Sequence, residues 1–213
     1  MVKAVKAALL GIVVGLFGCG PQEGPPVITG TDHRLQNHVP HTPLPPTTDY
    51  APLPSGPAQW TPSPAKEKPW KAIILHHSST DSGNMSIFDD YHRTKNWDGV
   101  GYHFVIGNGS GSGDGQVEVT HRWRDQVPGA HCGGTPNNWA NVDGIGICLV
   151  GDFTKTRPTP RQMQSLKTLV TFLQQHYKIP AERVYGHSDT PGYTRGSVCP
   201  GRYFPMTSFK RSL

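Results

Sequence analysis

The chain has 213 residues, a length that suits one ordinary domain with appendages. Hydrophobic residues make up only 35% of it, and its 25 Gly and 21 Pro account for much of the shortfall, so part of the chain is not packed into a core. The net charge of +5 comes without a run or stripe of Lys and Arg, which argues against a nucleic-acid-binding protein and suits an anionic polymer such as a cell wall.

The first eighteen residues have the pattern of an export signal. Residues 1–6 carry two lysines, and residues 7–17 form an apolar run that is too short to cross a bilayer as a helix. Leu-Phe-Gly-Cys at residues 16–19 resembles a bacterial lipobox, whose cysteine is lipidated and becomes the mature N-terminus. We therefore expect a signal peptide over residues 1–18 and an exported lipoprotein, anchored to a membrane of the cell envelope through Cys19, on its periplasmic side or at the cell surface. The alternative is an ordinary signal peptide followed by a chance cysteine.

Residues 19–68 have the composition of a tether. They are dense in proline and show neither helical nor strand periodicity. Proline-rich chains are extended and semi-rigid, so about fifty such residues could reach on the order of 100 Å from an anchor. The folded domain is expected to cover residues 69–213.

The first half of this domain contains three predicted strands and one helix. Lys71–His76 is an apolar run typical of a buried strand. Ser86 is the expected N-cap of a helix that runs to about Lys95. Val100–Ile106 and Gln116–Thr120 are predicted strands, and the Gly- and Ser-rich turn between them predicts a hairpin.

The second half adds two strands and a long helix. Gly144–Val150 is predicted as a central strand, and Glu182–His187 as the last strand. Thr159 and Pro160 open an amphipathic helix that Pro180 ends. The apolar face of this helix comprises Met163, Leu166, Leu169, Val170, Leu173 and Tyr177. The order of elements predicts an α/β fold, with a mixed central β-sheet flanked by helices in a single domain.

Three side chains near the predicted strand ends are candidate metal ligands. His76 and His187 each end a strand, and Cys199 follows within Cys-Pro-Gly. Exported proteins usually pair their thiols, but three cysteines remain after Cys19, so at least one has no partner within the domain. Two His and one Cys, with a fourth position left for water, are typical of catalytic zinc. Their spacing matches no zinc-finger motif, so the residues alone leave zinc ligation and a structural role both open.

Five short motifs then occur in a specific order. They are Leu-His-His-Ser at 75–78, Trp-Asp-Gly-Val-Gly-Tyr-His-Phe at 97–104, Gly-Ala-His at 129–131, Gly-Ile-Gly-Ile-Cys-Leu-Val-Gly at 144–151, and Gly-His at 186–187 with Cys-Pro-Gly at 199–201. Together they resemble the type 2 N-acetylmuramoyl-L-alanine amidase family, which includes phage lysozyme-type amidases and animal peptidoglycan recognition proteins. Each motif is moderately specific, but the five in order cover roughly residues 70–204 and are strongly specific together.

This resemblance implies one zinc ion held by His76, His187 and Cys199, and a catalytic role for Tyr102. It implies hydrolysis of the amide between N-acetylmuramic acid and L-alanine in bacterial peptidoglycan. The expected partners are therefore peptidoglycan or muropeptides, bound by a monomer. Judged by residue type alone, Tyr102 is equally compatible with packing in the core.

Further roles implied by the resemblance are less direct. Family members carry a Lys or Thr that stabilises the transition state two places before the cysteine, and here Ser197 holds that place, with Arg195 as its rival because the preceding loop is longer. By position, His92 and His131 resemble residues that line the substrate groove, or are surface histidines with a structural role.

Three other interpretations remain to be weighed against a zinc amidase. A non-catalytic peptidoglycan-binding lipoprotein would share the fold, but such relatives tend to lose the cysteine before Pro-Gly. A cytoplasmic recycling amidase conflicts with the signal segment. A purely structural set of His and Cys leaves Tyr102 unexplained. Cys132 and Cys148 form a disulfide or are both buried thiols, and the sequence does not decide between these states.

Overall fold

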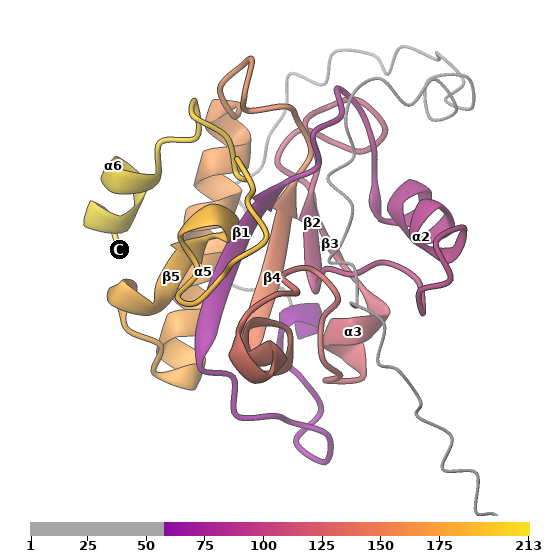
Figure 1. The fold of residues 1–213 in the computed structure, drawn as a ribbon, viewed down its shortest axis with the longest axis vertical. Coiled ribbons are helices and arrows are strands. Elements are labelled where there is room, and N and C mark those ends of the chain that lie inside the picture. Colours follow the sequence, from indigo (N-terminus) through magenta and orange to yellow (C-terminus); the bar gives the residue numbers. More distant parts are fainter. Residues whose placement is uncertain (1–57) are drawn as a thin grey trace, which may run out of the picture.

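The computed structural model describes residues 58–213, and the expected signal peptide, Cys19 and residues 19–57 of the tether lie outside the described residues (Figure 1). Five strands form one sheet in the order β3-β2-β4-β1-β5. Their bounds are β1 (Ala72–His77), β2 (Phe104–Ile106), β3 (Val117–Val119), β4 (Gly144–Leu149) and β5 (Val184–Gly186). All neighbours pair in parallel except β2 and β3, which form the expected antiparallel hairpin. The predicted mixed sheet with a central strand at β4 is therefore confirmed.

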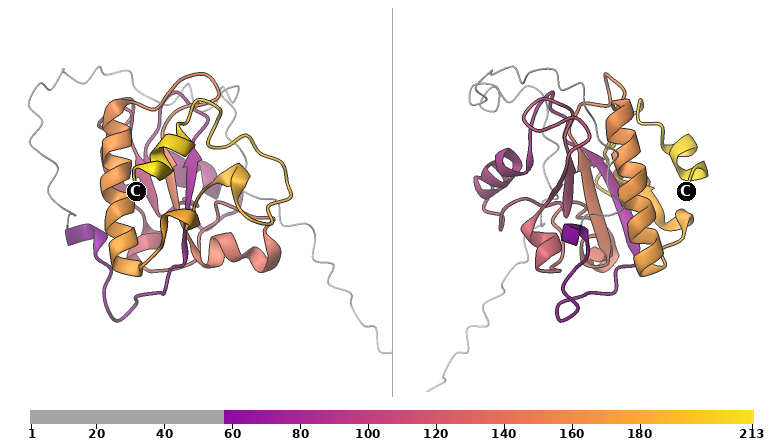
Figure 2. Two further views of the ribbon diagram at one scale, coloured as in Figure 1. Left: turned by 90° about the vertical axis from the view of Figure 1, so that its left-hand side faces the viewer. Right: turned by 180° about the vertical axis from the view of Figure 1, so that it is seen from behind.

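Helices cover both faces of this sheet. Figure 2 shows α5 packed along one face and α2 on the other side. The α-helices are α2 (Met85–Arg93), α3 (His121–Arg124), α4 (Trp139–Val142), α5 (Pro160–Tyr177) and α6 (Met206–Arg211). Four short 3-10 helices complete the fold: η1 (Ala58–Trp60), η2 (Pro136–Asn138), η3 (Ala181–Arg183) and η4 (His187–Asp189). Among residues 58–213, no helix is both long enough and apolar enough to cross a membrane.

The long helix α5 begins and ends where its sequence predicts. The hydroxyl of Thr159 accepts a hydrogen bond from the Gln162 amide, and the Gln162 side chain accepts one from the Thr159 amide, which completes a capping box. Pro160 occupies the first turn, where a missing N–H costs nothing. Lys178 adopts the left-handed conformation that ends many helices, and Pro180 follows it.

Several element boundaries differ from the expectation, and the last strand is shorter because Glu182 lies in η3 and His187 in η4. Two other differences have a clear cause in the hydrogen bonds. The N-cap of α2 is Asn84 and not Ser86, since the Asn84 side chain accepts a hydrogen bond of 2.8 Å from the Ile87 amide. The strand expected over 100–106 is shortened to β2. Backbone carbonyls that precede Phe104 accept hydrogen bonds from residues that are not in the sheet. The Gly101 carbonyl accepts from the Ala130 amide, and the Tyr102 carbonyl accepts from the Thr120 hydroxyl. Tyr102 therefore lies in a segment that leads into the strand.

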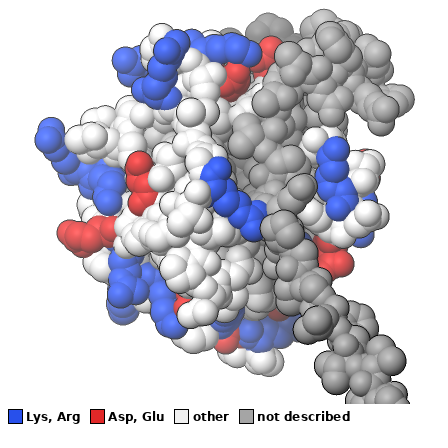
Figure 3. All heavy atoms as spheres, in the orientation of Figure 1, with Lys and Arg blue, Asp and Glu red and all other residues white. Residues whose placement is uncertain are grey.

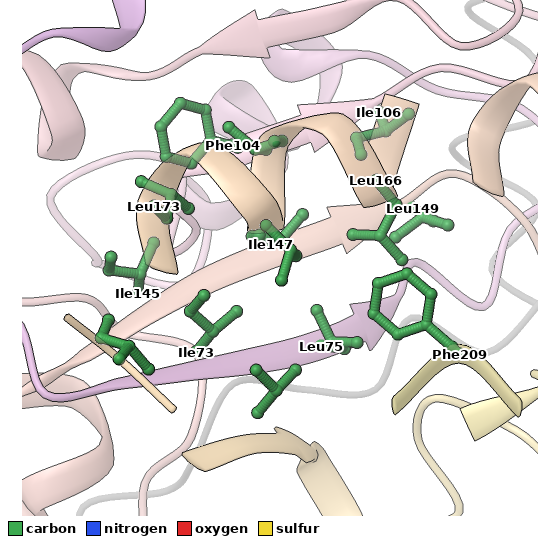
Figure 4. Close-up of a cluster of buried hydrophobic side chains, with 14 of the residues drawn as sticks. Ile73, Leu75, Phe104, Ile106, Ile145, Ile147, Leu149, Leu166, Leu173 and Phe209 are labelled. Atoms are coloured by element: carbon green, nitrogen blue, oxygen red, sulfur yellow. The ribbon is translucent and has the colours of Figure 1, made fainter. Parts of the chain in front are cut away.

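The two faces of the sheet have different residue sizes. Side chains alternate along β1 and β4, and those that face α5 are large and apolar, as Figure 4 shows. They include Ile73, Leu75, Ile145, Ile147 and Leu149, packed against Leu166 and Leu173 of α5 and Phe209 of α6. The opposite face of β1 ends in His76, and the opposite face of β4 carries only Gly144, Gly146 and Cys148. Small residues on this second face leave room for polar side chains beside His76.

The packed domain includes residues that the sequence analysis assigns to the tether. Trp60 of η1 is buried in the main core, with its ring 5.8 Å from that of Phe172. Its carbonyl accepts a hydrogen bond from the Trp123 indole. The folded unit therefore reaches back at least to residue 58, and the expected boundary at residue 69 lies inside it. A single tryptophan within a proline-rich stretch is the sequence signal for this extension.

Replacing Trp60 tests this boundary. We expect Trp60→Ala to lower the free energy of unfolding by about 3–5 kcal/mol, because it empties a large buried volume. The exposed neighbour Gln59 provides the control, and Gln59→Ala should change stability by less than about 0.5 kcal/mol. Urea unfolding of the full chain measures both. A loss below about 1 kcal/mol in Trp60→Ala would show that residues 58–68 are not part of the cooperative unit.

Candidate metal centre

Two of the predicted ligands lie side by side because their strands are neighbours. The strands β1 and β5 pair in parallel with Leu75 opposite Gly186, so the next residues, His76 and His187, follow at the same edge of the sheet. Their ring centroids are 4.8 Å apart, and both side chains are buried. The carboxyl ends of parallel strands are the usual location of ligand sites in such sheets.

The third predicted ligand, Cys199, reaches this point from a distant part of the chain. Its Sγ lies 3.7 Å from Nδ1 of His76 and accepts a hydrogen bond from the His77 amide. The Cys199 carbonyl accepts a hydrogen bond of 2.8 Å from the Ser188 amide, which ties the end of the loop to its beginning. One donor atom each from His76, His187 and Cys199 lie within 4.8 Å of one another.

This donor set fits a zinc ion. In a tetrahedral site with Zn–N and Zn–S bonds of about 2.0 and 2.3 Å, N and S ligand atoms are about 3.5 Å apart, close to the observed separation of His76 and Cys199. Nε2 of His187 is buried and has no hydrogen-bond partner among the described residues, as expected for an atom that binds an ion. The group contains no carboxylate, which disfavours magnesium and calcium. Three protein ligands leave a fourth position for water or substrate.

Burial sets the protonation of these ligands. It lowers the pKa of His76 well below its usual value and that of His187 to about 4, so both imidazoles are neutral at neutral pH. Burial raises the pKa of the Cys199 thiol to about 12. The histidines are therefore ready to bind an ion, whereas Cys199 must release a proton when a metal binds.

Tyr102, the predicted catalytic tyrosine, lies close to the candidate metal ligands. Its ring centroid is 5.2 Å from that of His76, and its phenol interacts with the buried thiol of Cys148. Burial raises the pKa of Tyr102 well above its usual value, so the hydroxyl keeps its proton and remains a hydrogen-bond donor. Packing in the core and proximity to the metal ligands, which the sequence offered as alternatives, both hold for this residue.

Ser197 has a structural contact in this loop. Its hydroxyl oxygen accepts a hydrogen bond of 3.1 Å from the Cys199 amide, and its hydroxyl also interacts with Tyr193. The ring of Tyr193 in turn packs edge-on against His187, at 4.6 Å. Ser197 therefore contacts Cys199 directly and His187 through Tyr193. These contacts give it a structural role and do not identify it as an oxyanion donor. The rival Arg195 is exposed, and its side chain lies over Gly134.

His92 and His131 are not exposed to a groove. Both have 0% of their surface accessible. His92 accepts a hydrogen bond from the Gly101 amide through Nδ1, and its ring packs against Trp97 at 4.8 Å. Nδ1 of His131 lies 3.1 Å from Nε2 of His76. The structure thus gives no support to the expected substrate contacts of His92 and His131, and instead places His131 in contact with the candidate metal ligand His76.

The three described cysteines are all free thiols, which decides a question that the sequence left open. Cys148 lies in β4, and Cys132 lies in a separate apolar cluster with Ile74 and Ala140. Both are buried, so their default role is that of small apolar side chains.

Comparison with known proteins agrees with this geometry. The family model for N-acetylmuramoyl-L-alanine amidase matches residues 66–202, more than half of the chain. The chain belongs to this family. Peptidoglycan-recognition protein 2 of Holotrichia diomphalia is 31% identical over 140 residues, 59% of this chain and 68% of that protein. The endolysin of Enterobacteria phage T3 is 35% identical over 117 residues, 51% of this chain and 69% of that protein.

Solved structures share the fold. The endolysin amidase LysCS of Clostridium intestinale has a TM-score of 0.56 and 28% identity, over 68% of this chain and 84% of that one. Bumblebee PGRP-SA has a TM-score of 0.54 at 24% identity, over 68% of this chain and 83% of that one, and shows the fold alone. The amidase family thus contains both enzymes and recognition proteins by name, so the family does not by itself assign catalysis to this member.

Arg195, in the loop that precedes Cys199, helps to line a large cavity, but neither the three candidate ligands nor Tyr102 line it. It has a volume of about 1010 Å³ and is lined by both charged and aromatic side chains. The lining includes Lys95, Trp97, His121, Arg122, Asp125 and Arg195. The sequence analysis gives none of these residues a place in a cavity, although it names Trp97 and Arg195 for other reasons, because they come from separate segments and no local pattern links them. On the face in Figure 3, Lys and Arg are scattered with Asp and Glu among them, so the cationic residues are not gathered into one stripe there.

Two further buried histidines, His103 and His92, predict how the stability of this amidase-family domain depends on pH. Burial lowers the pKa of His103 to about 3 and that of His92 to about 4, whereas an unfolded chain titrates near 6.5. Below pH 6.5 these histidines are protonated in the unfolded state but remain neutral in the folded state. The free energy of unfolding should therefore fall from pH 6.5 towards pH 4. Denaturant unfolding in the presence of a chelator, at several pH values, measures this slope. His103→Leu should unfold with a shallower pH dependence, and a flat wild-type profile would contradict the burial of neutral rings.

Proposed function

We propose that this chain is a zinc-dependent amidase that hydrolyses the bond between N-acetylmuramic acid and L-alanine in bacterial peptidoglycan. The observation that carries the proposal is the convergence of the three donor atoms of His76, His187 and Cys199 beside the buried Tyr102. A family that contains endolysins and amidases supports the same reaction.

Each residue of the proposed site has a separate role in hydrolysis. A zinc ion held by His76, His187 and Cys199 would supply a water of pKa near 7 and polarise the amide carbonyl. The two neutral imidazoles and the Cys199 thiolate would hold it through one donor atom each. Tyr102, which keeps its proton, donates a hydrogen bond from its hydroxyl to an oxygen at the reacting carbon and orients it. We retain Ser197 as a candidate oxyanion donor, through its hydroxyl or the neighbouring backbone amides.

The cavity that Arg195 helps to line suits a long, charged ligand. Its volume exceeds what a single amide needs, and its lining mixes basic groups with Asp125 and the indole of Trp97. Basic groups fit the carboxylates of a peptide stem, and the indole offers a flat surface to a sugar ring. We therefore assign the cavity to the peptidoglycan or muropeptide on one side of the bond that is cut.

Zinc analysis and digestion of purified peptidoglycan test the proposed function. We expect the full chain to contain one zinc ion and to release intact stem peptides that begin with a free L-alanine amine, as identified by mass spectrometry. Cys199→Ser should lose both zinc and product, because a hydroxyl does not replace a thiolate ligand. The matched control is Cys132→Ala, a buried cysteine outside the ligand set, which should keep both.

A second variant separates catalysis from metal binding. Tyr102→Phe removes only the hydroxyl, so it should keep its zinc and its binding to peptidoglycan while its rate falls by about 10²–10⁴. Zinc bound by the wild type without any release of stem peptides would favour the alternative function, a peptidoglycan-binding lipoprotein without catalysis. Activity of Tyr102→Phe equal to that of the wild type would remove this residue from the mechanism.

We also propose that Cys19 carries a lipid that anchors the domain to a membrane of the cell envelope. The support is the signal-like segment before Cys19 and the proline-rich segment after it. In a bacterial host, the wild-type chain should fractionate with membranes and yield a lipid-modified N-terminal peptide. Cys19→Ala should lose the modification. Recovery of an unmodified Cys19 in the wild type contradicts the anchor and leaves the amidase proposal untouched.

A further inference from the structure

A chain of hydrogen bonds joins the backbone of β4 to one of the metal ligands. Nε2 of His131 lies 3.3 Å from the carbonyl oxygen of Gly144, and its Nδ1 lies 3.1 Å from Nε2 of His76. Nδ1 of His76 faces the thiol of Cys199 at 3.7 Å. Both rings are buried, and they meet edge-on with centroids 5.0 Å apart. The two histidines of this hydrogen-bond chain are therefore shielded from solvent.

The chemistry of each partner fixes the position of each proton. A carbonyl oxygen only accepts hydrogen bonds, so the Nε2 of His131 that faces Gly144 carries the proton. The other nitrogen of the neutral His131 ring, Nδ1, is then an acceptor. His76 must therefore hold its own proton on Nε2 to complete the pair. Its Nδ1 is left with a free lone pair, directed at the point where the three ligand atoms converge.

We propose that His131 is a positioning residue that holds His76 in the tautomer whose Nδ1 is ready to bind the metal. The inference rests on the proposed zinc function, and it gives His131 a different role from the substrate contact that the sequence implied. Metal-bound histidines generally donate their second N–H to a carbonyl or carboxylate, which fixes the ring and its tautomer. In this protein the imidazole of His131 is the acceptor, and it is itself fixed by its hydrogen bond to the Gly144 carbonyl of β4.

The surroundings of His131 hold its ring in one position. The Asn141 side chain accepts hydrogen bonds of 2.8 Å from the amides of both His131 and Cys132. Glycines on two sides make room for the ring, because a Cβ at Gly129 or at Gly146 would lie 2.3 Å from Cδ2 of His131. Gly146 is in the middle of the central strand, where glycine weakens a sheet, so the space that it leaves for this ring is a physical reason for its presence.

Without an acceptor at position 131, the N–H of His76 has no partner in a buried site. An unpaired buried donor is unfavourable, so the proton of His76 shifts towards Nδ1, which faces the Cys199 sulfur. A metal ion then competes with that proton for the same lone pair. Loss of this kind of outer partner typically weakens metal binding by about 10–100-fold.

The test compares His131→Leu with a matched control, His103→Leu. His103 is also a wholly buried histidine of this core, but both of its ring nitrogens bond to backbone, to the Gly146 amide and the Val127 carbonyl. Zinc affinity of the full chain is measured by competition with a chromophoric chelator, and folding is checked by circular dichroism. We expect about 10–100-fold weaker zinc binding in His131→Leu, and a change below about threefold in His103→Leu.

A spectroscopic measurement on the metal-free wild type needs no variant to fold. Long-range ¹H–¹⁵N NMR, with the His76 signal assigned from its loss in His76→Asn, should show a protonated Nε2 and a bare Nδ1. A proton on Nδ1 of His76 in the wild type overturns the inference, as does equal weakening of zinc binding in the two leucine variants. The NMR result stands even if the wild type binds zinc without cutting peptidoglycan, so a failure of the proposed function is distinguishable from a failure of this inference.

Discussion

The parallel pairing of β1 with β5 is the constraint on which the site depends. It brings the carboxyl ends of two strands that are more than a hundred residues apart to one edge of the sheet, and each strand delivers a histidine there. The register matters as much as the pairing, because side chains alternate between faces. A slip of β1 by one residue would turn His76 towards α5 and present His77 in its place. His77 is held on the α5 side by the Phe153 amide and the Ser79 hydroxyl, so the two adjacent histidines have separate roles.

The central strand β4 supports this arrangement with its two unlike faces. Isoleucine and leucine on one face supply the packing with α5 that keeps the sheet in place (Figure 4). Glycine and cysteine on the other face leave the volume that His131 and Tyr102 occupy. Stability and site construction are therefore assigned to opposite sides of a single six-residue strand. The polar ring of His131 can be buried there because both of its nitrogens have hydrogen-bond partners.

The sequence predicts the parts of the fold that repeat a strong local pattern. The apolar period and caps of α5 and the apolar runs of β1 and β4 are sufficient to locate these elements, and the order of motifs points to three side chains that the structure brings together as candidate metal ligands. Burial of Trp60 and the environments of His92 and His131 depend on contacts between distant segments, which a local pattern does not contain. The cap at Asn84 is a local contact with the Ile87 amide, two residues before the expected cap. His131 illustrates the difference, because its position in a motif marks it as important, whereas only the packed structure shows that it contacts His76 and no exposed surface. The short helices α3, α4 and α6 have too few residues to show a period.

The packing of Trp60 has a mechanical consequence. Tension on the chain at residue 58 would act first on Trp60, which packs against Phe172 and accepts a hydrogen bond from the Trp123 indole. Trp60 belongs to the main core on the α5 side of the sheet, whereas His76 lies on the opposite face near the end of β1, in contact with Cys199. Tension applied at residue 58 would therefore load the aromatic packing around Trp60 before it reached His76, His187 and Cys199.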